Sequence, residues 1–195
     1  DFDVQEDYIN LDDSEVYGFE IDLQNNLSFL SAPFNGIVLN ANVSRLWSKT
    51  FVPLYFKVTK WDPALRRNVV DVENSYYEYK ETSLPDQTEW ISNFTIGYDL
   101  KGFSARISMI YQSAYLRGLS SAGEASGSEF SNRYTDDFLR FDASLSQRIG
   151  SHIRIMANFA NISGESERSY QYISEYWRSE NRYGTTIDLG FQYRF

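Results

Sequence analysis

The sequence lacks cysteine, has a single histidine and contains no run of eighteen consecutive apolar residues. A chain without cysteine is compatible with export through an oxidising periplasm. A membrane-spanning helix is excluded, because about 20 mostly apolar residues in a row are needed to cross a bilayer. The net charge is −9 and there is no basic stripe that would neutralise phosphates, so no nucleic-acid partner is expected.

Aromatic residues are plentiful by contrast, at 17% of the chain with 15 Tyr and 14 Phe. Membrane barrels place such side chains in girdles at the two lipid–water interfaces, although a soluble β-sandwich can also be rich in tyrosine. The mean hydropathy of −0.46 does not argue against a membrane, because barrel strands alternate apolar and polar residues.

The clearest pattern lies at the carboxy-terminal end, from Tyr183 to Phe195. Its odd-numbered positions are almost wholly apolar or aromatic, and its even-numbered positions are polar or glycine. Because the side chains of a strand alternate between two faces, this stretch predicts a strand with one apolar and one polar face. A strand of about 9–11 residues with these two faces is typical of an outer-membrane barrel.

The same period-two pattern predicts strands at seven places, which are about Val16–Leu30, Ile37–Trp47, Trp90–Tyr98, Phe103–Tyr111, Leu139–Leu145, Ile153–Phe159 and Tyr183–Phe195. The charged residues within these stretches fall in phase with the polar positions; they are Glu20, Asp22, Arg106, Arg140, Asp142, Arg154, Asp188 and Arg194. Such a face would meet bulk water in a sandwich and line the lumen in a barrel, so its charges do not distinguish the two folds.

The links between these strands are alternately short and long. The short links are Ser31–Gly36, Asp99–Gly102 and Gln147–His152, and the long ones are about Thr50–Glu89, Ser113–Asp136 and Asn161–Asn181. Outer-membrane barrels have this asymmetry, with tight periplasmic turns and long external loops. Within the longest link we expect a hairpin of Phe51–Lys60 and Val69–Thr82 that turns at Asp62–Pro63 and extends the strands above the membrane. The small, polar segment Ser120–Ser128 is expected to be mobile.

The predicted fold class is therefore all-β, an antiparallel transmembrane β-barrel. Seven strands would leave two unpaired edges that lipid cannot satisfy. We therefore expect residues 1–195 to form the carboxy-terminal part of a larger barrel, with partner strands upstream of Asp1 and with Asp1–Glu15 as the end of another external loop.

Four motifs resemble the carboxy-terminal barrel region of TonB-dependent outer-membrane receptors of a Bacteroidota-like type. They are Tyr17–Asp22 (YGFEID), Leu39–Ser44 (LNANVS, with Val43 where the family usually has Tyr), Gly102–Arg106 (GFSAR) and the terminal set Asp188, Gly190, Tyr193 and Phe195. The terminal set matches the signal that the barrel-assembly machinery reads, and it occurs in outer-membrane barrels generally.

The resemblance implies a barrel of about 22 strands closed by an amino-terminal plug that lies outside this chain. It implies energised uptake of a large scarce nutrient: a metal chelate, cobalamin, an oligosaccharide or a peptide. The implied partners are outer-membrane lipid, the upstream strands and plug, the TonB system acting through the amino-terminal segment, the barrel-assembly machinery and a surface lipoprotein.

Aromatic residues of the long links are the candidate ligand-binding residues, because their flat faces suit sugars, aromatic chelates and peptides. They are Trp61, Tyr76, Tyr77, Tyr79, Tyr172 and Trp177, with Tyr170 and Tyr176 nearby. An interfacial girdle or loop support is the alternative role. Arg66, Arg67, Lys57 and Lys60 would face an anionic ligand, lipopolysaccharide or solvent.

No enzyme signature, cofactor motif or metal-ligand cluster stands out in the sequence. His152 lies in a short turn, remote from the external loops, and the pairs Asp12–Asp13 and Asp136–Asp137 read as solvated acids, with loop-bound calcium left open. Two other functions remain: a passive porin or a structural or secretion-associated barrel, and a secreted soluble β-sandwich that binds carbohydrate.

Overall fold

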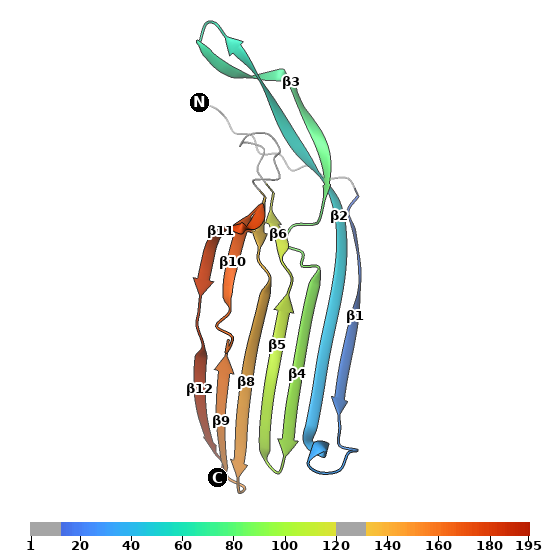
Figure 1. The fold of residues 1–195 in the computed structure, drawn as a ribbon, viewed down its shortest axis with the longest axis vertical. Helices are drawn as coiled ribbons and strands as arrows, with labels where there is room; N and C mark the ends of the chain where they lie inside the picture. Colours follow the sequence, from blue (N-terminus) through green and yellow to red (C-terminus); the bar gives the residue numbers. More distant parts are fainter. Residues whose placement is uncertain (1–12, 120–131) are drawn as a thin grey trace.

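The computed structural model describes residues 13–119 and 132–195, and its fold is all-β with antiparallel strand pairing (Figure 1). No helix in these two ranges is long and apolar enough to cross a membrane. The strands run in chain order from β1 to β12, with a short 3-10 helix, η1 (Phe34–Gly36), before β2. Of the predicted external loop Asp1–Glu15, residues 1–12 lie outside the described ranges, as does Ser120–Ser128, and Glu15 begins β1.

Seven strands of the described chain lie side by side in the larger sheet, in the order β1-β2-β4-β5-β8-β9-β12, and β3 pairs with β2. Their bounds are β1 (Glu15–Asn26), β2 (Ile37–Asp62), β4 (Trp90–Leu100), β5 (Phe103–Gln112), β8 (Phe138–Ile149), β9 (Ile153–Ala160) and β12 (Thr186–Tyr193). Each of the seven sequence ranges predicted to be a strand corresponds to one of these strands.

Two predicted strand bounds differ from the observed ones. The first strand ends at Asn26 and not at Leu30, because residues 27–30 form a turn in which the Leu30 N–H donates to the Leu27 carbonyl at 3.0 Å. The last strand begins at Thr186 and not at Tyr183, because Gly184 has a left-handed backbone with φ of 67°. Alternation in sequence continues past both points, but the backbone conformation does not.

The cross-strand register places the predicted apolar faces of all seven strands on one side of the sheet. Ile107 of β5, for example, lies opposite Ile96 of β4 and Ala143 of β8. Leu145 of β8 lies opposite Ala157 of β9, which lies opposite Leu189 of β12. We call this side, with the residues that share its register, the apolar face, and the opposite side the polar face. A slip of one residue in any pair would have exchanged the two faces of that strand.

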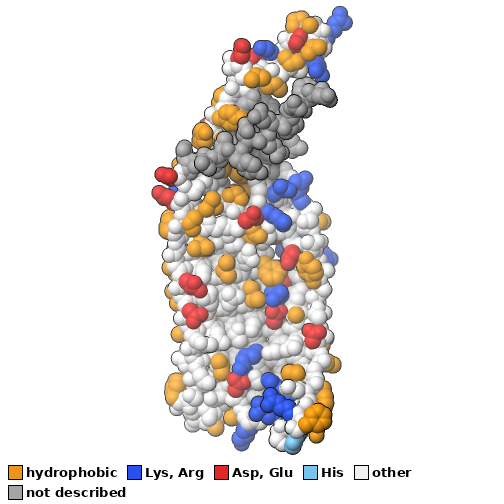
Figure 2. Space-filling model, turned by 180° about the vertical axis from the view of Figure 1, so that it is seen from behind, with side chains coloured by type: hydrophobic (Ala, Val, Ile, Leu, Met, Phe, Trp, Pro, Cys, Tyr) orange, Lys and Arg blue, Asp and Glu red, His pale blue; other side chains and the backbone are white. Residues whose placement is uncertain are grey.

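The apolar face is exposed. Leu189 is 80% exposed, Phe191 is 68% exposed and Ile21 is 61% exposed. Among the described residues, the only buried hydrophobic side chains are Val52 and Leu116. Figure 2 shows the molecule from behind, where acidic and basic side chains are spread along the height of the sheet. The larger sheet therefore has no hydrophobic core within the described part of the chain.

The short links lie together at the lower end of the sheet in Figure 1, as the alternation of link lengths predicts. Between β4 and β5 the turn residues Lys101 and Gly102 both have positive φ, at 49° and 82°. A two-residue turn with two left-handed residues is the type I′ hairpin, whose twist matches that of the strands it joins. The Gly102 carbonyl also accepts a hydrogen bond from the N–H of Arg148, at 2.9 Å, which ties this turn to β8.

The predicted hairpin in the longest link is confirmed. β2 continues without a break to Asp62, and β3 (Arg67–Thr82) returns antiparallel to it. The Asp62 carboxylate accepts hydrogen bonds from the N–H groups of Ala64 and Leu65, at 2.8 and 3.2 Å, and so shapes the turn. β3 does not continue into β4, because residues 83–89 form a loop between them.

The expectation that the other two long links, Ser113–Asp136 and Asn161–Asn181, are simple loops is wrong. They contain β6 (Tyr115–Gly118), β7 (Arg133–Thr135), β10 (Ser166–Gln171) and β11 (Ile173–Arg182). These strands form a second sheet in the order β11-β10-β7-β6, above β12, β9, β8 and β5 respectively (Figure 1). These strands show no clear period-two pattern in the sequence, because they are short and because the register shifts between β10 and β11 and between β6 and β7.

Gly97 provides the space for an ion pair on the polar face. Arg106 lies directly across from Gly97, and its guanidinium bonds to the Asp99 carboxylate at 2.9 and 2.5 Å. A Cβ atom on residue 97 would lie 2.6 Å from Cδ of Arg106.

We predict that Gly97→Val displaces Arg106 and removes this ion pair. In the wild-type background Arg106→Gln should cost about 1 kcal/mol or less in the free energy of unfolding, and in the Gly97→Val background almost nothing. Thermal unfolding followed by circular dichroism measures this coupling. Gly190→Val is the matched control, because its neighbour is the flexible Met156 side chain at 3.1 Å. Additive effects of Gly97→Val and Arg106→Gln would contradict the prediction.

Candidate functional site

The candidate site lies on the polar side of the junction between the two sheets. At this level β9 ends and is followed by the turn that leads to β10, and the link from β11 to β12 lies beside that turn. Asn161 holds the junction together, with a φ of 57° and only 8% of its surface exposed. Its side-chain Nδ2 donates to the carbonyls of Glu165 and Gly184 at 2.9 and 3.1 Å. Its Oδ1 accepts from the Glu165 N–H at 2.8 Å, so a single amide closes the turn 161–165 and joins it to the link at Gly184.

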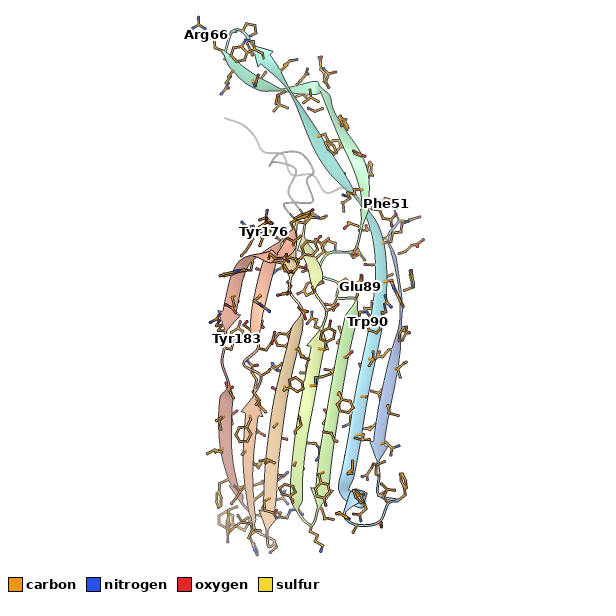
Figure 3. All side chains as sticks on the ribbon, viewed as in Figure 1. Phe51, Arg66, Glu89, Trp90, Tyr176 and Tyr183 are labelled. Atoms are coloured by element: carbon orange, nitrogen blue, oxygen red, sulfur yellow. The ribbon has the colours of Figure 1, made fainter. Side chains whose placement is uncertain are left out.

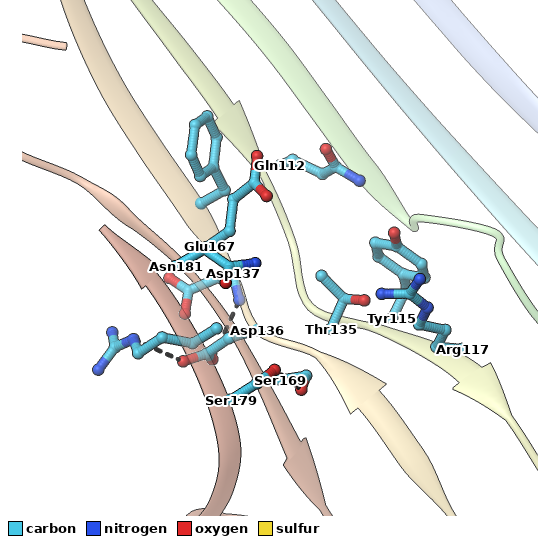
Figure 4. A pocket seen from close by; sticks show the side chains of 12 residues that line it. Gln112, Tyr115, Arg117, Thr135, Asp136, Asp137, Glu167, Ser169, Ser179 and Asn181 are labelled. Carbon is cyan, nitrogen blue, oxygen red and sulfur yellow. Dashed lines mark hydrogen bonds and ion pairs between the residues drawn. The ribbon is translucent and has the colours of Figure 1, made fainter. Parts of the chain in front are cut away.

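A cavity of about 270 Å³ opens at this junction (Figure 4). Gln112 and Phe138 line it from the larger sheet, and they lie opposite each other on the polar face. Asp136 and Asp137 line it from the link between β7 and β8, and the second sheet supplies the remaining lining residues, which are Tyr115, Arg117, Thr135, Glu167, Arg168, Ser169, Ser179 and Asn181. Hydroxyl, carboxylate, amide and guanidinium groups therefore dominate the lining, and these suit a ligand that makes many hydrogen bonds.

The charged groups of the cavity are unevenly placed. Figure 4 shows Asp136, Asp137 and Glu167 on one side and Arg117 with Tyr115 on the other. One carboxylate oxygen of Asp136 forms an ion pair with Nε of Arg168 at 3.4 Å, and the other accepts a hydrogen bond from the N–H of Asp137 at 3.0 Å. Arg117 has no such carboxylate in the described lining at the distances of an ion pair. A ligand would thus meet acceptors on one wall and a donor on the other.

Asp136 is the most perturbed acid of the cavity. Burial raises the pKa of its carboxyl, and the neighbouring Asp137 raises it further, while the Asp137 N–H and Arg168 act in the opposite direction. Burial also raises the pKa of Tyr170, with the charge on Asp136 as the next cause. Desolvation outweighs the ion pair with Arg168, because that contact is long and the guanidinium is about half exposed.

Two of the six candidate ligand-binding residues line a common surface. Tyr172 and Trp177 border an open cavity of about 490 Å³ together with Tyr176, Glu175 and Arg178. Trp177 is 65% exposed and Tyr176 is 63% exposed, so their ring faces are available to a ligand. Tyr172 has a left-handed backbone with φ of 68° at the turn between β10 and β11, and this turn carries it to the same place.

The other four candidate ligand-binding residues, Trp61, Tyr76, Tyr77 and Tyr79, lie on the β2–β3 hairpin. The hairpin rises away from the second sheet, and the labelled Arg66 at its tip is far from Tyr176 (Figure 3). Tyr76 stacks on Phe56, with ring centroids 5.2 Å apart. Tyr77 and Tyr79 share one face of β3, opposite to that of Tyr76, and both are more than half exposed. The structure therefore does not gather the six predicted residues into one site.

Lys60 of the hairpin and the turn histidine have local partners. Nζ of Lys60 bonds to the Asp71 carboxylate at 3.2 Å. Nδ1 of His152 lies 2.8 Å from the Ser151 hydroxyl, and its ring stacks on Tyr193 at a centroid distance of 6.1 Å. Among the described residues, no three His, Asp or Glu side chains are placed to hold a metal ion.

The four residues of the proposed assembly signal occupy two different settings. Asp188 and Gly190 lie on the polar face of β12, opposite Asn158 and Met156. Tyr193 lies on the apolar face, and its ring meets that of Phe195 edge-on with centroids 5.2 Å apart.

Most of the junction cavity could not be found from the sequence. Tyr115, Thr135 and Ser169 come together only because β6, β7 and β10 pair in that register. Each lies in a segment whose residues show neither a motif nor a regular period. The adjacent acids Asp136 and Asp137 were the only signal, and they were interpreted as solvated. Comparisons with protein-family models, with curated proteins and with solved structures found no match for this chain.

We predict that Asp137→Asn lowers the pKa of Asp136, because a like charge is removed. Carboxyl carbon NMR shifts measure the titration, and Asp62→Asn at the hairpin tip is the control that changes one remote charge. Because the folded-state pKa of Asp136 is raised, its contribution to stability is present below the ordinary carboxyl pKa and is lost as the pH rises through the folded value. Asp137→Asn should narrow the pH range over which this contribution to stability is lost, because it brings the folded-state pKa of Asp136 closer to the ordinary carboxyl value. An unchanged Asp136 titration would contradict the prediction.

Proposed function

We propose that this chain forms the carboxy-terminal wall of a TonB-dependent outer-membrane receptor that takes up a large scarce nutrient. The observation that carries the proposal is the apolar face, which seven adjacent strands share and no described segment covers. Contiguous apolar surfaces of this size are rare on soluble monomers. Lipid is the environment in which such a face needs no protein cover, and the polar face would then line the lumen.

The placement of aromatic residues on the apolar face supports a membrane setting. Trp90 and Tyr98 stand near opposite ends of β4, and Tyr111 and Phe103 near opposite ends of β5. Each pair is eight residues apart, which is about 27 Å along a strand. The outward apolar band of outer-membrane barrels is about 25 Å tall and is bordered by aromatic girdles, with strands that tilt. The spacing of the two aromatic levels is of that order.

The two ends of the larger sheet differ in the way that the proposal requires. Tight turns lie at the lower end, and the hairpin and the second sheet rise from the upper end (Figure 1). We place the lower end in the periplasm and the upper end outside the cell. The outer edges of β1 and β12 have no partner strand among the described residues. Further strands of a barrel of about 22 would satisfy their backbone groups, with a plug inside.

The external part of the chain supplies the features of a ligand site. The junction cavity offers hydroxyl, carboxylate and guanidinium groups, and the cavity at Tyr172 and Trp177 offers aromatic surfaces. This combination favours an oligosaccharide or a peptide among the nutrients considered, since both carry many hydrogen-bonding groups. Energy coupling would come from the TonB system through the plug, assembly from the barrel-assembly machinery, and a surface lipoprotein would be a further external partner.

A passive porin is the second candidate function. Arg140 and Asp142 of β8 and Arg154 of β9 all lie on the polar face. Charged side chains of this kind also line water-filled lumens. Steady ion conductance through the purified native protein would favour the porin, whereas a closed barrel that binds its nutrient would favour the receptor.

Single-cysteine labelling tests the membrane setting, because this chain contains no cysteine. We expect spin labels on Ile107→Cys and Leu189→Cys to be relaxed by oxygen dissolved in the bilayer. Labels on the adjacent polar-face positions Ser108→Cys and Asp188→Cys should instead be relaxed by a water-soluble nickel chelate. Equal access of the nickel chelate to both faces would contradict the proposal and favour the soluble carbohydrate-binding β-sandwich.

The terminal strand gives a second test. Replacing Tyr193 and Phe195 by Ser should lower the surface level of the native protein several-fold before it changes uptake per assembled molecule. Tyr193 and Phe195 form the aromatic end of the proposed assembly signal. Tyr183→Ser, which lies outside β12, is the control. Surface levels equal to those of the wild type would refute the role of these two residues.

A further inference from the structure

The apolar face carries charged residues at one place only within the seven strands of the larger sheet. They are Glu15, Arg45 and Lys49, all at the upper end of the ladder that joins β1 to β2, below the hairpin into which β2 continues. Arg45 is the lowest of the three, two positions below Trp47 on β2. The register sets it opposite Phe19 of β1 and Trp90 of β4. The guanidinium of Arg45 thus lies at the upper margin of the apolar face, and below it this face carries no charged residue.

Aromatic rings enclose the Arg45 side chain. Its guanidinium carbon lies 4.3 Å from the ring centroid of Trp47 and 4.6 Å from that of Trp90. Phe19 meets both of these rings, at centroid distances of 5.9 and 6.4 Å, and Tyr17 stacks on Trp47 at 5.4 Å. We call these five residues the Arg45 cluster. Contacts between a cation and two ring faces restrict the guanidinium plane, which lowers the entropy lost when a ligand binds to its edge.

The donors of Arg45 are not satisfied by the described protein. Nε is buried from solvent and has no hydrogen-bond partner. The neighbouring Lys49 has a counter-ion, because its Nζ lies 2.7 Å from the Glu81 carboxylate. Arg45 is therefore the cation of this margin that has no counter-ion among the described residues. Its buried Nε carries a cost of desolvation, so an anion from outside the described chain that reached the rest of the guanidinium would stabilise the cluster.

The height of Arg45 indicates which acceptor would be present. Arg45 follows Ile37 at the lower end of β2 by eight residues, or about 27 Å along the strand. If the apolar face spans the hydrocarbon layer as proposed above, this places the guanidinium at the outer lipid–water interface. Phosphate groups of lipids lie at that level. Because Nε is covered, a phosphate would meet the two Nη groups, which can donate to two of its oxygens in the two-point geometry that arginine favours.

We propose that the Arg45 cluster is a binding site for the phosphate group of an outer-leaflet lipid. Arg45 makes the two-point contact, Trp47 and Trp90 hold the guanidinium, and Phe19 and Ile21 of β1, level with Arg45 and below it, lie against the acyl chains. The inference rests on the proposed membrane setting but not on the uptake of any nutrient. It assigns a lipid-binding role to residues outside the transport site.

The test compares lipid retention by the intact native protein in phosphatidylcholine nanodiscs that contain diphosphorylated lipid A. After transfer to detergent, native mass spectrometry measures how much lipid A remains bound. We expect Arg45→Gln to retain about tenfold less than the wild type, since charged hydrogen bonds are lost. Arg45→Lys should be intermediate, because it keeps the charge without the two-point contact. Arg154→Gln on the polar face is the matched control and should retain lipid A normally.

Several results would overturn the proposal. Equal retention by Arg45→Gln and the wild type would remove Arg45 from any lipid site. Equal retention of lipid A and its dephosphorylated form would exclude the phosphate as the recognised group. Displacement of lipid A by inorganic phosphate would make the cluster a small-anion site. If neither the wild type nor any variant entered nanodiscs, the membrane setting itself would be overturned. If all of them entered nanodiscs but Arg45→Gln retained lipid A normally, only the lipid site would be overturned.

Discussion

The rest of this structure depends on the shared register of seven antiparallel strands. Each strand has one apolar face, and hydrogen bonding between neighbours places all these faces on the same side. Because side chains alternate with a period of two, one slipped pair would have put the apolar residues of the strands beyond it on the same side as the charges of the polar face. The result is a sheet without a core in the described chain. Its apolar side must be covered by something else, and lipid is the cover that we propose.

The same alignment organises the upper end of the molecule. β6, β7, β10 and β11 stand above the four strands they follow or precede, so the second sheet repeats the strand order of the larger one. Polar contacts of Asn161 and of Asp136 hold the junction where the two sheets meet. The junction cavity lies where the strand pairing is interrupted, between the pair Gln112 and Phe138 of the larger sheet and the pair Tyr115 and Thr135 of the second sheet. Arg45 shows a related effect on the other face, where register alone surrounds a cation with aromatic rings.

Sequence reasoning succeeded where a structural property is local. Alternation located the seven strands and the short link Asp99–Gly102. The turn signal Asp62–Pro63 between β-favouring residues located the hairpin, and each of these features depends on neighbouring residues. Sequence reasoning was wrong about the links Ser113–Asp136 and Asn161–Asn181, where strands are short and bulged. It also grouped six aromatic residues because they lie in the long links, and only Tyr172 and Trp177 come together. Trp61 and Tyr79 are held apart from them by the length of the hairpin.

The sequence by itself determined that the chain is built from two-faced strands, which side chains share a face, and where the tight turns lie. These follow from backbone geometry within a few residues. Only the tertiary structure decided which residues of different strands are neighbours. The walls of the junction cavity, the partners of Asp136 and the rings around Arg45 all depend on pairing between distant segments. Such pairing is chosen by the hydrogen-bond register of the whole sheet, and no single stretch of sequence contains it.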